Sequence, residues 1–369
     1  MTSSDLYPVS RLAAVQEATA KAGLDALLLT PGPDLRYVSG YDAKPLERLT
    51  CLVVPASGEA YMMVPRLELP AAEASPASRL GLEFVAWDET DDPYAIAAAR
   101  LGRPARVGLA DRMWAMSSLR FRAALPGTEQ VLAGSVLREL RMRKSPAEVA
   151  ALRQAGEAID GVHRQVPGLL RAGRTEREVA RDIAEAILAS GHATVDFVIV
   201  ASGPNGASPH HDVSDRVIQA GEPVVVDIGG ALHNGYCSDS TRTYSVGEPP
   251  AEFAAYYEVL RQAQDAACRA VRPGVSCESI DAAARDVIAA AGHGDHFVHR
   301  TGHGIGIETH EEPYIVAGNG EPMEPGFAFS VEPGIYLPGR HGARIEDIVV
   351  CTDGGYERLN NTPRELVVV

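Results

Sequence analysis

The chain has 369 residues, enough for two domains, and its hydrophobic fraction of 46% is ordinary for a globular protein. Its 34 basic and 49 acidic side chains give a formal net charge of −15, which disfavours nucleic acid and anionic membranes as partners because both are polyanions. We expect no signal peptide, and no segment approaches the roughly 20 apolar residues of a membrane span. The five cysteines are widely spaced and form no C-x-x-C pair, so we expect a reduced, cytoplasmic protein.

Residues 1–140 alternate helical and strand-like segments. Arg11–Gly23 is predicted to be a helix ended by glycine, and the apolar run Leu24–Leu29 follows it as a strand. Further short strands are expected at Leu52–Val54, Tyr61–Val64 and Val107–Leu109. No G-x-G-x-x-G motif follows a strand, so a dinucleotide site is not expected. This alternation predicts a small α/β domain.

Residues 141–369 are predicted to form an α+β domain with an antiparallel sheet. The motif Ser-Pro-Ala-Glu at 145–148 combines a capping serine, a proline at the first helical position and a glutamate that completes a capping box. We expect this helix to run to about residue 170. Thr-Glu-Arg-Glu at 175–178 repeats the pattern for a helix that ends near residue 189. Two later helices are expected over Ala251–Val271 and Cys277–Ala291.

Two aspartates occupy strand-like segments of this second domain. The apolar run at 223–226 ends in Asp227 and two glycines, and Asp239 lies twelve positions further on. Leu232–Gly235 can form the turn of a hairpin that brings the two aspartates together. Either residue alone is more typical of a turn or a cap. A buried carboxylate at a strand end is costly unless it is paired or bound to a metal.

Two glutamates repeat this arrangement in the second half of the domain. The apolar run at 327–331 ends in Glu332, and Glu346 follows fourteen positions later within another strand-like segment. Tyr336–Gly342 can supply the turn between them. The repetition points to an internal duplication. Four carboxylates cannot share a protein core without cations.

A histidine completes the predicted metal site. His303 lies among glycines in the segment H-R-T-G-H-G-I-G, which leaves room for a ligand to approach closely. An oxygen-rich site with one imidazole suits Mn²⁺ or a similar divalent ion. Four carboxylates exceed the need of one ion, and a pair of ions polarises a carbonyl and lowers the pKa of a bridging water. The residues therefore predict hydrolysis at a dinuclear centre and leave the substrate open.

At these residues the sequence resembles the creatinase/prolidase-type metallopeptidases, whose catalytic domain has the pita-bread fold. The resemblance covers essentially the whole chain. Five motifs carry it, in the expected order: V-V-V-D-I-G-G, Y-C-S-D-S-T-R-T, G-H-G-I-G, V-E-P-G-I-Y and R-I-E-D. One of these motifs alone is weakly specific, whereas five together are strongly so.

The resemblance implies two divalent metal ions, with Mn²⁺ as the first choice and Co²⁺ or Zn²⁺ as alternatives. It implies that Asp227 binds one ion, that His303 and Glu332 bind the other, and that Asp239 and Glu346 bridge the two. A water held between the ions is expected to attack the peptide carbonyl.

The resemblance also implies roles for residues around the metals. Glu332 is expected to act as general base, and His210 and His310 to contact the scissile peptide and stabilise the oxyanion. His299 is expected to line the substrate pocket, and Arg344 to orient the site through a carboxylate.

The implied substrate is a small peptide with proline in the second position. A segment of 140 residues before the catalytic domain argues against a methionine aminopeptidase, and the ligand set argues against creatinase. We favour an Xaa-Pro dipeptidase, active as a homodimer. The alternatives are an Xaa-Pro aminopeptidase that acts on longer peptides, and an inactive pita-bread binding module.

One departure from the family concerns substrate selection. Many prolidases have an arginine four residues after the second catalytic histidine, and this chain has Tyr314 there. A strict dipeptidase needs a cation for the free carboxylate of its substrate. Arg48 is the first candidate and Lys44 the second, because both lie in an N-terminal loop that can reach the pocket of a partner subunit. The alternative is that both are ordinary solvated charges.

Overall fold

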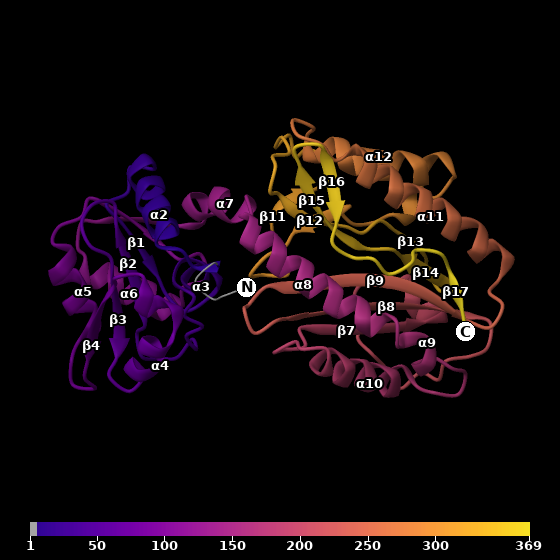
Figure 1. Cartoon of the computed structure of the whole chain (residues 1–369), viewed down its shortest axis with the longest axis horizontal. Coiled ribbons are helices and arrows are strands. Elements are labelled where there is room, and N and C mark those ends of the chain that lie inside the picture. The colour runs from indigo at the N-terminus through magenta and orange to yellow at the C-terminus, as the bar shows by residue number, and fades with distance from the viewer. Residues whose placement is uncertain (1–5) are drawn as a thin grey trace. The chain divides into compact units, whose positions relative to one another are not determined.

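The computed structural model describes residues 6–369, and the chain divides into two compact units between Arg141 and Met142. Figure 1 labels most of the helices and strands of both units. Within the described residues, no helix is both long enough and apolar enough to cross a membrane.

The N-terminal unit is built around one mixed β-sheet. Its strand order is β4-β3-β2-β1-β5-β6, with antiparallel β3-β2-β1 pairs and parallel outer pairs. The strands are β1 Ala26–Leu29, β2 Cys51–Pro55, β3 Tyr61–Pro65, β4 Glu83–Trp87, β5 Arg106–Leu109 and β6 Glu129–Leu132. The helices are α2 Val9–Lys21, α3 Pro33–Ser39, α4 Leu69–Ala74, the 3₁₀ helix η1 Pro76–Arg79, α5 Pro93–Leu101, α6 Ala115–Ala124 and α7 Gly134–Met142. The expected α/β class is confirmed.

The C-terminal unit contains helices in pairs and largely antiparallel sheets. The helices are α8 Pro146–His163, α9 Val166–Leu169, α10 Glu176–Ala189, η2 Gly203–Ala207, α11 Ala251–Ala270, α12 Cys277–Ala290 and η3 Gly294–His296. The strands are β7 Phe197–Ser202, β8 Glu222–Ala231, β9 Cys237–Val246, β10 Gly302–Gly304, β11 Glu311–Ile315, β12 Ala328–Val331, β13 Gly334–Leu337, β14 His341–Arg344, β15 Asp347–Thr352, β16 Gly355–Arg358 and β17 Val367–Val368. The sheet orders are β17-β9-β8-β7, β11-β10-β12-β15-β16 and β13-β14. This is the expected α+β architecture.

Each half of the C-terminal unit packs helices against one face of a sheet (Figure 1). Helices α8, α9 and α10 share a hydrophobic core with β7, β8 and β9. Helices α11 and α12 share another with β11–β15. Because side chains alternate between the faces of a strand, residues next to these core positions point to the face away from the helices. Those positions carry the acidic residues singled out in the sequence.

The helix starts follow the sequence, but one predicted helix is too long. Capping boxes begin α8 at Ser145 and α10 at Thr175, as expected. The helix expected to reach residue 170 instead ends at His163, and α9 follows as a separate turn. Pro167 explains the break, because it lacks an N–H for the carbonyl of His163 and its ring would clash with that carbonyl.

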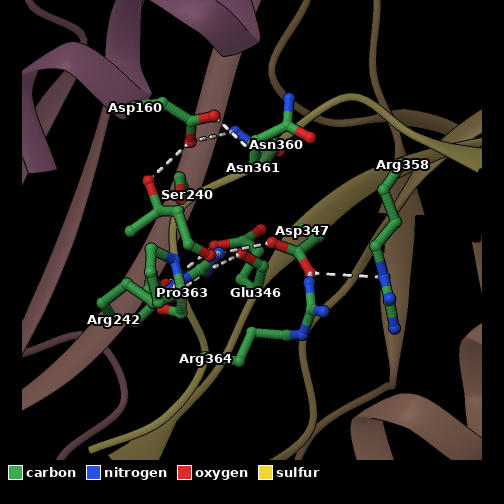
Figure 2. Close-up of polar contacts among 12 residues, drawn as sticks. Asp160, Ser240, Arg242, Glu346, Asp347, Arg358, Asn360, Asn361, Pro363 and Arg364 are labelled. Carbon is green, nitrogen blue, oxygen red and sulfur yellow. Dashed lines mark hydrogen bonds and ion pairs between the residues drawn. The ribbon is translucent and has the colours of Figure 1, made fainter.

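Two buried aspartates, one on β15 and one on α8, hold the C-terminal segment through hydrogen bonds (Figure 2). Asp347 on β15 accepts hydrogen bonds from Arg242 Nη2 on β9 at 2.6 Å and from Arg364 Nη1 at 3.1 Å. Asp160 on α8 accepts from Thr362 Oγ1 at 2.8 Å and from the backbone N–H of Asn361.

Arg242 connects this network to Glu346, the residue before Asp347. Arg242 is only 2% exposed. Its guanidinium donates to the backbone carbonyls of Glu346, Thr362 and Pro363. It and Arg364 hold the pKa of Asp347 below its usual range, although burial opposes ionisation. The segment with Glu346, immediately before β15, is therefore anchored through the backbone carbonyl of Glu346 and the side chain of Asp347.

We predict that Asp347→Asn strongly destabilises the C-terminal unit. The amide cannot balance the buried charge of Arg242, and breaking a buried ion pair costs about 3–5 kcal/mol. Denaturant unfolding of the metal-free proteins measures the change in the free energy of unfolding. Glu357→Gln breaks an exposed pair with Arg153 and should cost under about 1 kcal/mol. Equal losses for the two variants would contradict the proposed importance of the buried network.

Candidate metal centre and active site

Asp227 and Asp239 lie on one face of the β8–β9 hairpin. In the strand register, Asp227 is opposite Thr241 and Gly229 is opposite Asp239, so the two aspartates are diagonal neighbours. The neighbouring Val226 and Ile228 belong to the core under the helices, which places both carboxylates on the other face. The hairpin expected from the sequence therefore forms and brings the acids together.

Gly229 is required by the packing of this hairpin. A Cβ at this position would lie 2.5 Å from the ring of Phe197 and 2.6 Å from the carbonyl oxygen of Ser238. Gly229, two residues after Asp227, thus allows strands β7, β8 and β9 to pair closely beside the two carboxylates.

Glu332 and Glu346 lie just outside the paired ends of a second pair of strands. Strand β12 pairs antiparallel with β15, and Val331 is opposite Asp347. Glu332 follows the buried Val331, whereas Glu346 precedes Asp347, whose side chain faces Gln264 on α11. Glu346 also joins the first hairpin, because its backbone N–H donates to the carbonyl of Thr241 and its carboxylate accepts from Thr241 Oγ1 at 2.7 Å.

His303 is held between two strands by glycines on both sides. A Cβ at Gly302 would lie 1.8 Å from the carbonyl oxygen of Ser330, and one at Gly304 would lie 2.2 Å from that of Glu312. Strand β10 therefore packs tightly between β11 and β12. The backbone N–H of His303 donates to Ser330 Oγ, whose hydroxyl donates to the carboxylate of Glu332.

The imidazole of His303 faces the acids through one nitrogen. Its Nδ1 lies 3.1 Å from the carbonyl oxygen of Gly304, which can only accept, so Nδ1 donates. Nε2 then lies 3.1 Å from Glu332 Oε1 and 3.6 Å from Asp239 Oδ2. An unprotonated nitrogen so close to carboxylate oxygens is stable only with a cation or a proton between them. Fixing the other nitrogen in this way is typical of histidine ligands.

The acids strongly perturb one another. Burial and the charges of neighbouring carboxylates raise the pKa of Asp239 and of Glu346 well above their usual values. Burial opposes ionisation of Glu332 too, but the hydrogen bond and charge of His303 lower the pKa of Glu332 to about 2. The site thus concentrates negative charge that its own basic groups only partly balance.

These donors fit divalent cations. Ligand atoms of Asp239, His303 and Glu346 all lie within 4.8 Å of one another, and all three residues are buried. Asp227 Oδ1 is also buried and has no hydrogen-bond partner among the described residues. Buried polar atoms are normally satisfied, so an orphaned carboxylate oxygen at this place indicates a missing ligand. Carboxylates with one imidazole suit hard to borderline metals.

His210 follows a loop that a buried glutamate organises. Glu176, at the start of α10, accepts hydrogen bonds from Ser202, Asn205, His211 and Ser214, with His211 Nε2 at 2.8 Å. These bonds outweigh the opposing effect of burial and lower the pKa of Glu176. The residue next to His210 is therefore tied to a rigid helix terminus.

His310 and His299 border the same cavity. The ring centroids of His310 and His303 are 4.1 Å apart. Burial, together with the charges of His303 and Arg300, lowers the pKa of His310 to about 4. Burial also lowers the pKa of His299. Both imidazoles are therefore neutral near pH 7 and can each donate one hydrogen bond.

A chain of hydrogen bonds links His299 to Asp227. His299 Nδ1 donates to the carbonyl of Arg300, which leaves Nε2 to accept from Tyr336 Oη at 2.8 Å. Arg344 Nη1 donates to the same hydroxyl oxygen at 2.8 Å, and Arg344 Nη2 donates to Asp227 Oδ2. Arg344 thus contacts a carboxylate of the site.

One cavity of about 620 Å³ collects nearly all the candidate residues. It is lined by His210, Asp227, Asp239, His299, His303, His310, Glu332, Arg344 and Glu346, together with Phe197, Ile199, Pro209 and Arg300. Arg48 does not line it. In the N-terminal unit, Arg48 forms ion pairs with Glu68 at 3.0 Å and with Glu47 at 2.8 Å.

Sequence reasoning missed several residues of this site. Phe197, Ile199 and Arg300 line the cavity, Tyr336 bonds to His299, and Glu176 holds the loop of His210 through His211. Arg300 and Tyr336 lie inside motifs that were recognised, so their position next to candidate residues was a usable signal. Glu176 offered no such signal, because it looked like an ordinary first-turn residue of a capped helix.

The chain matches two known sequence families. The family described as metallopeptidase family M24 matches residues 150–353, and the creatinase/prolidase N-terminal domain matches residues 11–143. These matches confirm the resemblance stated from the motifs.

Individual relatives are similar over almost their full length. The "Probable dipeptidase PepE" of Mycobacterium tuberculosis is 56% identical over 97% of this chain and 96% of its own. The Xaa-Pro dipeptidase of Lactobacillus delbrueckii subsp. lactis is 34% identical over 94% of this chain and 95% of its own.

The fold is shared with solved structures. The crystal structure of dipeptidase PepE from Mycobacterium ulcerans superposes with a TM-score of 0.93 and 57% sequence identity, over 98% of this chain and 97% of that one. Together with the sheet orders above, this similarity confirms the expected pita-bread catalytic domain, which follows an α/β N-terminal domain along the chain. The protein is a member of metallopeptidase family M24 with a creatinase/prolidase N-terminal domain.

Proposed function

We propose that this protein is a dinuclear metallopeptidase that hydrolyses Xaa-Pro dipeptides. The observation that carries the proposal is a set of four carboxylates and one imidazole in the wall of a 620 Å³ cavity, which three further histidines also line. Three of these five residues, Asp239, His303 and Glu346, are buried with their ligand atoms within 4.8 Å of one another. The relatives named dipeptidase and Xaa-Pro dipeptidase support the choice of substrate.

The metal ligands in this proposal are the five residues of the cluster. Asp227 would hold one ion, His303 and Glu332 would hold the other, and Asp239 and Glu346 would be shared between the two. Mn²⁺ is the first choice, with Co²⁺ or Zn²⁺ as alternatives. When bound, two such ions polarise a peptide carbonyl, lower the pKa of a water between them and stabilise the tetrahedral intermediate.

The side chains around the metals supply proton transfer and orientation. In this proposal Glu332, next to His303 in the cavity wall, accepts the proton released by the attacking water and acts as general base. His210 and His310 donate hydrogen bonds to the oxygen that becomes negative in the transition state. His299, which lines the cavity, contacts the substrate, and Arg344 keeps Asp227 in position.

Cleavage of Ala-Pro and of Ala-Pro-Ala distinguishes the two peptidase activities. A dipeptidase should have a much higher kcat/KM for Ala-Pro, whereas an aminopeptidase should cleave the tripeptide at least as well. An enzyme without activity on either substrate would contradict the proposal.

We predict that Asp239→Asn abolishes hydrolysis and lowers the metal content. An amide is a poorer bridge than a carboxylate, and the bridge is required for both ions. The metal-free variant should nevertheless be at least as stable to heat as the metal-free wild type, because one source of repulsion among the buried acids is gone. Elemental analysis, melting curves and assays of Ala-Pro measure the three quantities.

Asp286→Asn, an exposed change on α12, is the control for Asp239→Asn. It should retain metal and activity. Two full-occupancy ions in an active Asp239→Asn variant would exclude the bridging role.

His310→Ala separates chemistry from metal binding. Loss of one donor to the oxyanion typically lowers kcat by about 10²–10³-fold, while KM and metal content should change little. Steady-state kinetics on Ala-Pro with metal analysis test this. His233→Ala, an exposed position outside the cavity, should leave kcat unchanged. Near-normal kcat in the His310 variant would assign it a structural role.

We also propose that the enzyme is a cytoplasmic homodimer in which the N-terminal unit of one subunit approaches the active site of the other. Five free, buried cysteines support a reducing compartment. Light scattering during size-exclusion chromatography should give twice the mass of one chain. A fully active monomer would overturn the dimer proposal.

A further inference from the structure

The active-site cavity is lined by two guanidiniums that differ in their partners. Arg344 is committed to Asp227 and to the hydroxyl of Tyr336. Arg300 lines the same cavity, yet within residues 6–369 no carboxylate forms an ion pair with it. The cavity therefore contains a half-buried positive charge that is available to an anion.

Arg300 is held in place by an aromatic ring. Its guanidinium carbon lies 4.4 Å from the ring centroid of Tyr314, a favourable cation–π geometry. Tyr314 is directly opposite His303 in the β10–β11 ladder, and its carbonyl accepts from Asn319 Nδ2 at 2.7 Å. The stack thus places the positive charge beside the strand that carries the imidazole of the candidate metal centre.

The backbone around Arg300 is equally well ordered. Arg285 Nη2 donates to the carbonyl of His299 at 2.9 Å, and the N–H and hydroxyl of Thr301 donate to Asp281. Arg285 and Asp281 are themselves paired along α12. A rigid backbone lowers the entropy that the arginine would lose on binding a ligand.

We propose that Arg300 binds the free α-carboxylate of the C-terminal residue of the substrate and thereby selects dipeptides over longer peptides. This inference rests on the proposed function and names its specificity-determining residue. The carboxylate groups of the cavity wall repel an anionic substrate, and Arg300 provides the compensating site. A guanidinium binds a carboxylate through two parallel hydrogen bonds, which a peptide bond or amide cannot match.

This assignment also explains the tyrosine at position 314. The cation that many prolidases carry at this position is replaced by a ring that supports a cation from position 300. Arg48, the candidate from the sequence, already shares its charge with Glu68 and Glu47, and a substrate would have to compete with both.

The test compares Ala-Pro with Ala-Pro-NH₂, which has nearly the same size but no carboxylate, and with Ala-Pro-Ala. For Arg300→Gln we expect kcat/KM on Ala-Pro to fall about 10–100-fold, mainly through KM, because hydrogen bonds to charged groups are lost. The kcat/KM on Ala-Pro-NH₂ should barely change, so the preference for the free carboxylate should collapse. Arg300→Lys should retain part of the preference, and Tyr314→Leu should reduce it by a few-fold.

Arg153→Gln, a surface change in the same unit, is the matched control. It should leave kcat/KM unchanged for both Ala-Pro and Ala-Pro-NH₂. Metal content and circular dichroism of each variant verify the fold. Should Arg300→Gln fail to fold, Arg300→Lys and Tyr314→Leu carry the test.

Equal losses on Ala-Pro and Ala-Pro-NH₂ would overturn the role of Arg300, as would a preference lost in Arg48→Ala but kept in Arg300→Gln. Failure of the proposed function has a different signature. It shows in the wild-type enzyme alone, as equal cleavage of Ala-Pro and Ala-Pro-Ala or as no cleavage of either.

Discussion

Repulsion among buried carboxylates is the constraint on which the C-terminal unit depends. Four acids share one cavity wall, and burial and mutual repulsion raise the pKa of Asp239 and of Glu346. Arg344 and His303 offset only part of this charge. Cations are the natural remaining compensation, so metal binding and stability of the folded unit should be thermodynamically linked.

The surrounding fold makes this unfavourable cluster possible because the residues next to the acids are held by core packing and by buried polar contacts. Alternation along β8 and β9 gives these strands an apolar face toward the helices and an acidic face toward the cavity, while Glu332 directly follows β12 and Glu346 directly precedes β15. The ion pair of Arg242 with Asp347 then anchors the segment around Glu346 and the C-terminal residues in one network (Figure 2). Ligands on rigid strands are positioned more accurately than ligands on loops.

Support of a different kind holds the residues that face the substrate. Glu176 bonds to His211, the residue after His210, and Tyr336 bonds to His299 itself, so hydrogen bonds from neighbouring elements hold the loop of His210 and the ring of His299. Among the guanidiniums of the cavity, Arg344 is paired with Asp227, whereas Arg300 forms no ion pair with a carboxylate of residues 6–369. On the proposals made above, Arg344 supports the carboxylate cluster and Arg300 selects the substrate within the same cavity.

Local signals in the sequence were sufficient for the architecture and the acid cluster. Apolar runs that end in an acid and a glycine predicted the strands of Asp227 and Glu332, and capping boxes located the starts of α8 and α10. These features depend on neighbouring residues and on strand or helix periodicity, which a sequence displays directly. The end of α8 was misjudged because the helical pattern was extended across Pro167.

Tertiary structure alone decided which distant residues support and complete the site. Glu176 meets a loop 35 residues away through His211, and Arg300 meets Tyr314 across the bend between β10 and β11. Neither pairing has a local pattern, since each arises from the way strands and helices pack after they form. A charged side chain therefore reveals whether it is paired or free for a ligand only when the folded chain has placed every possible partner around it.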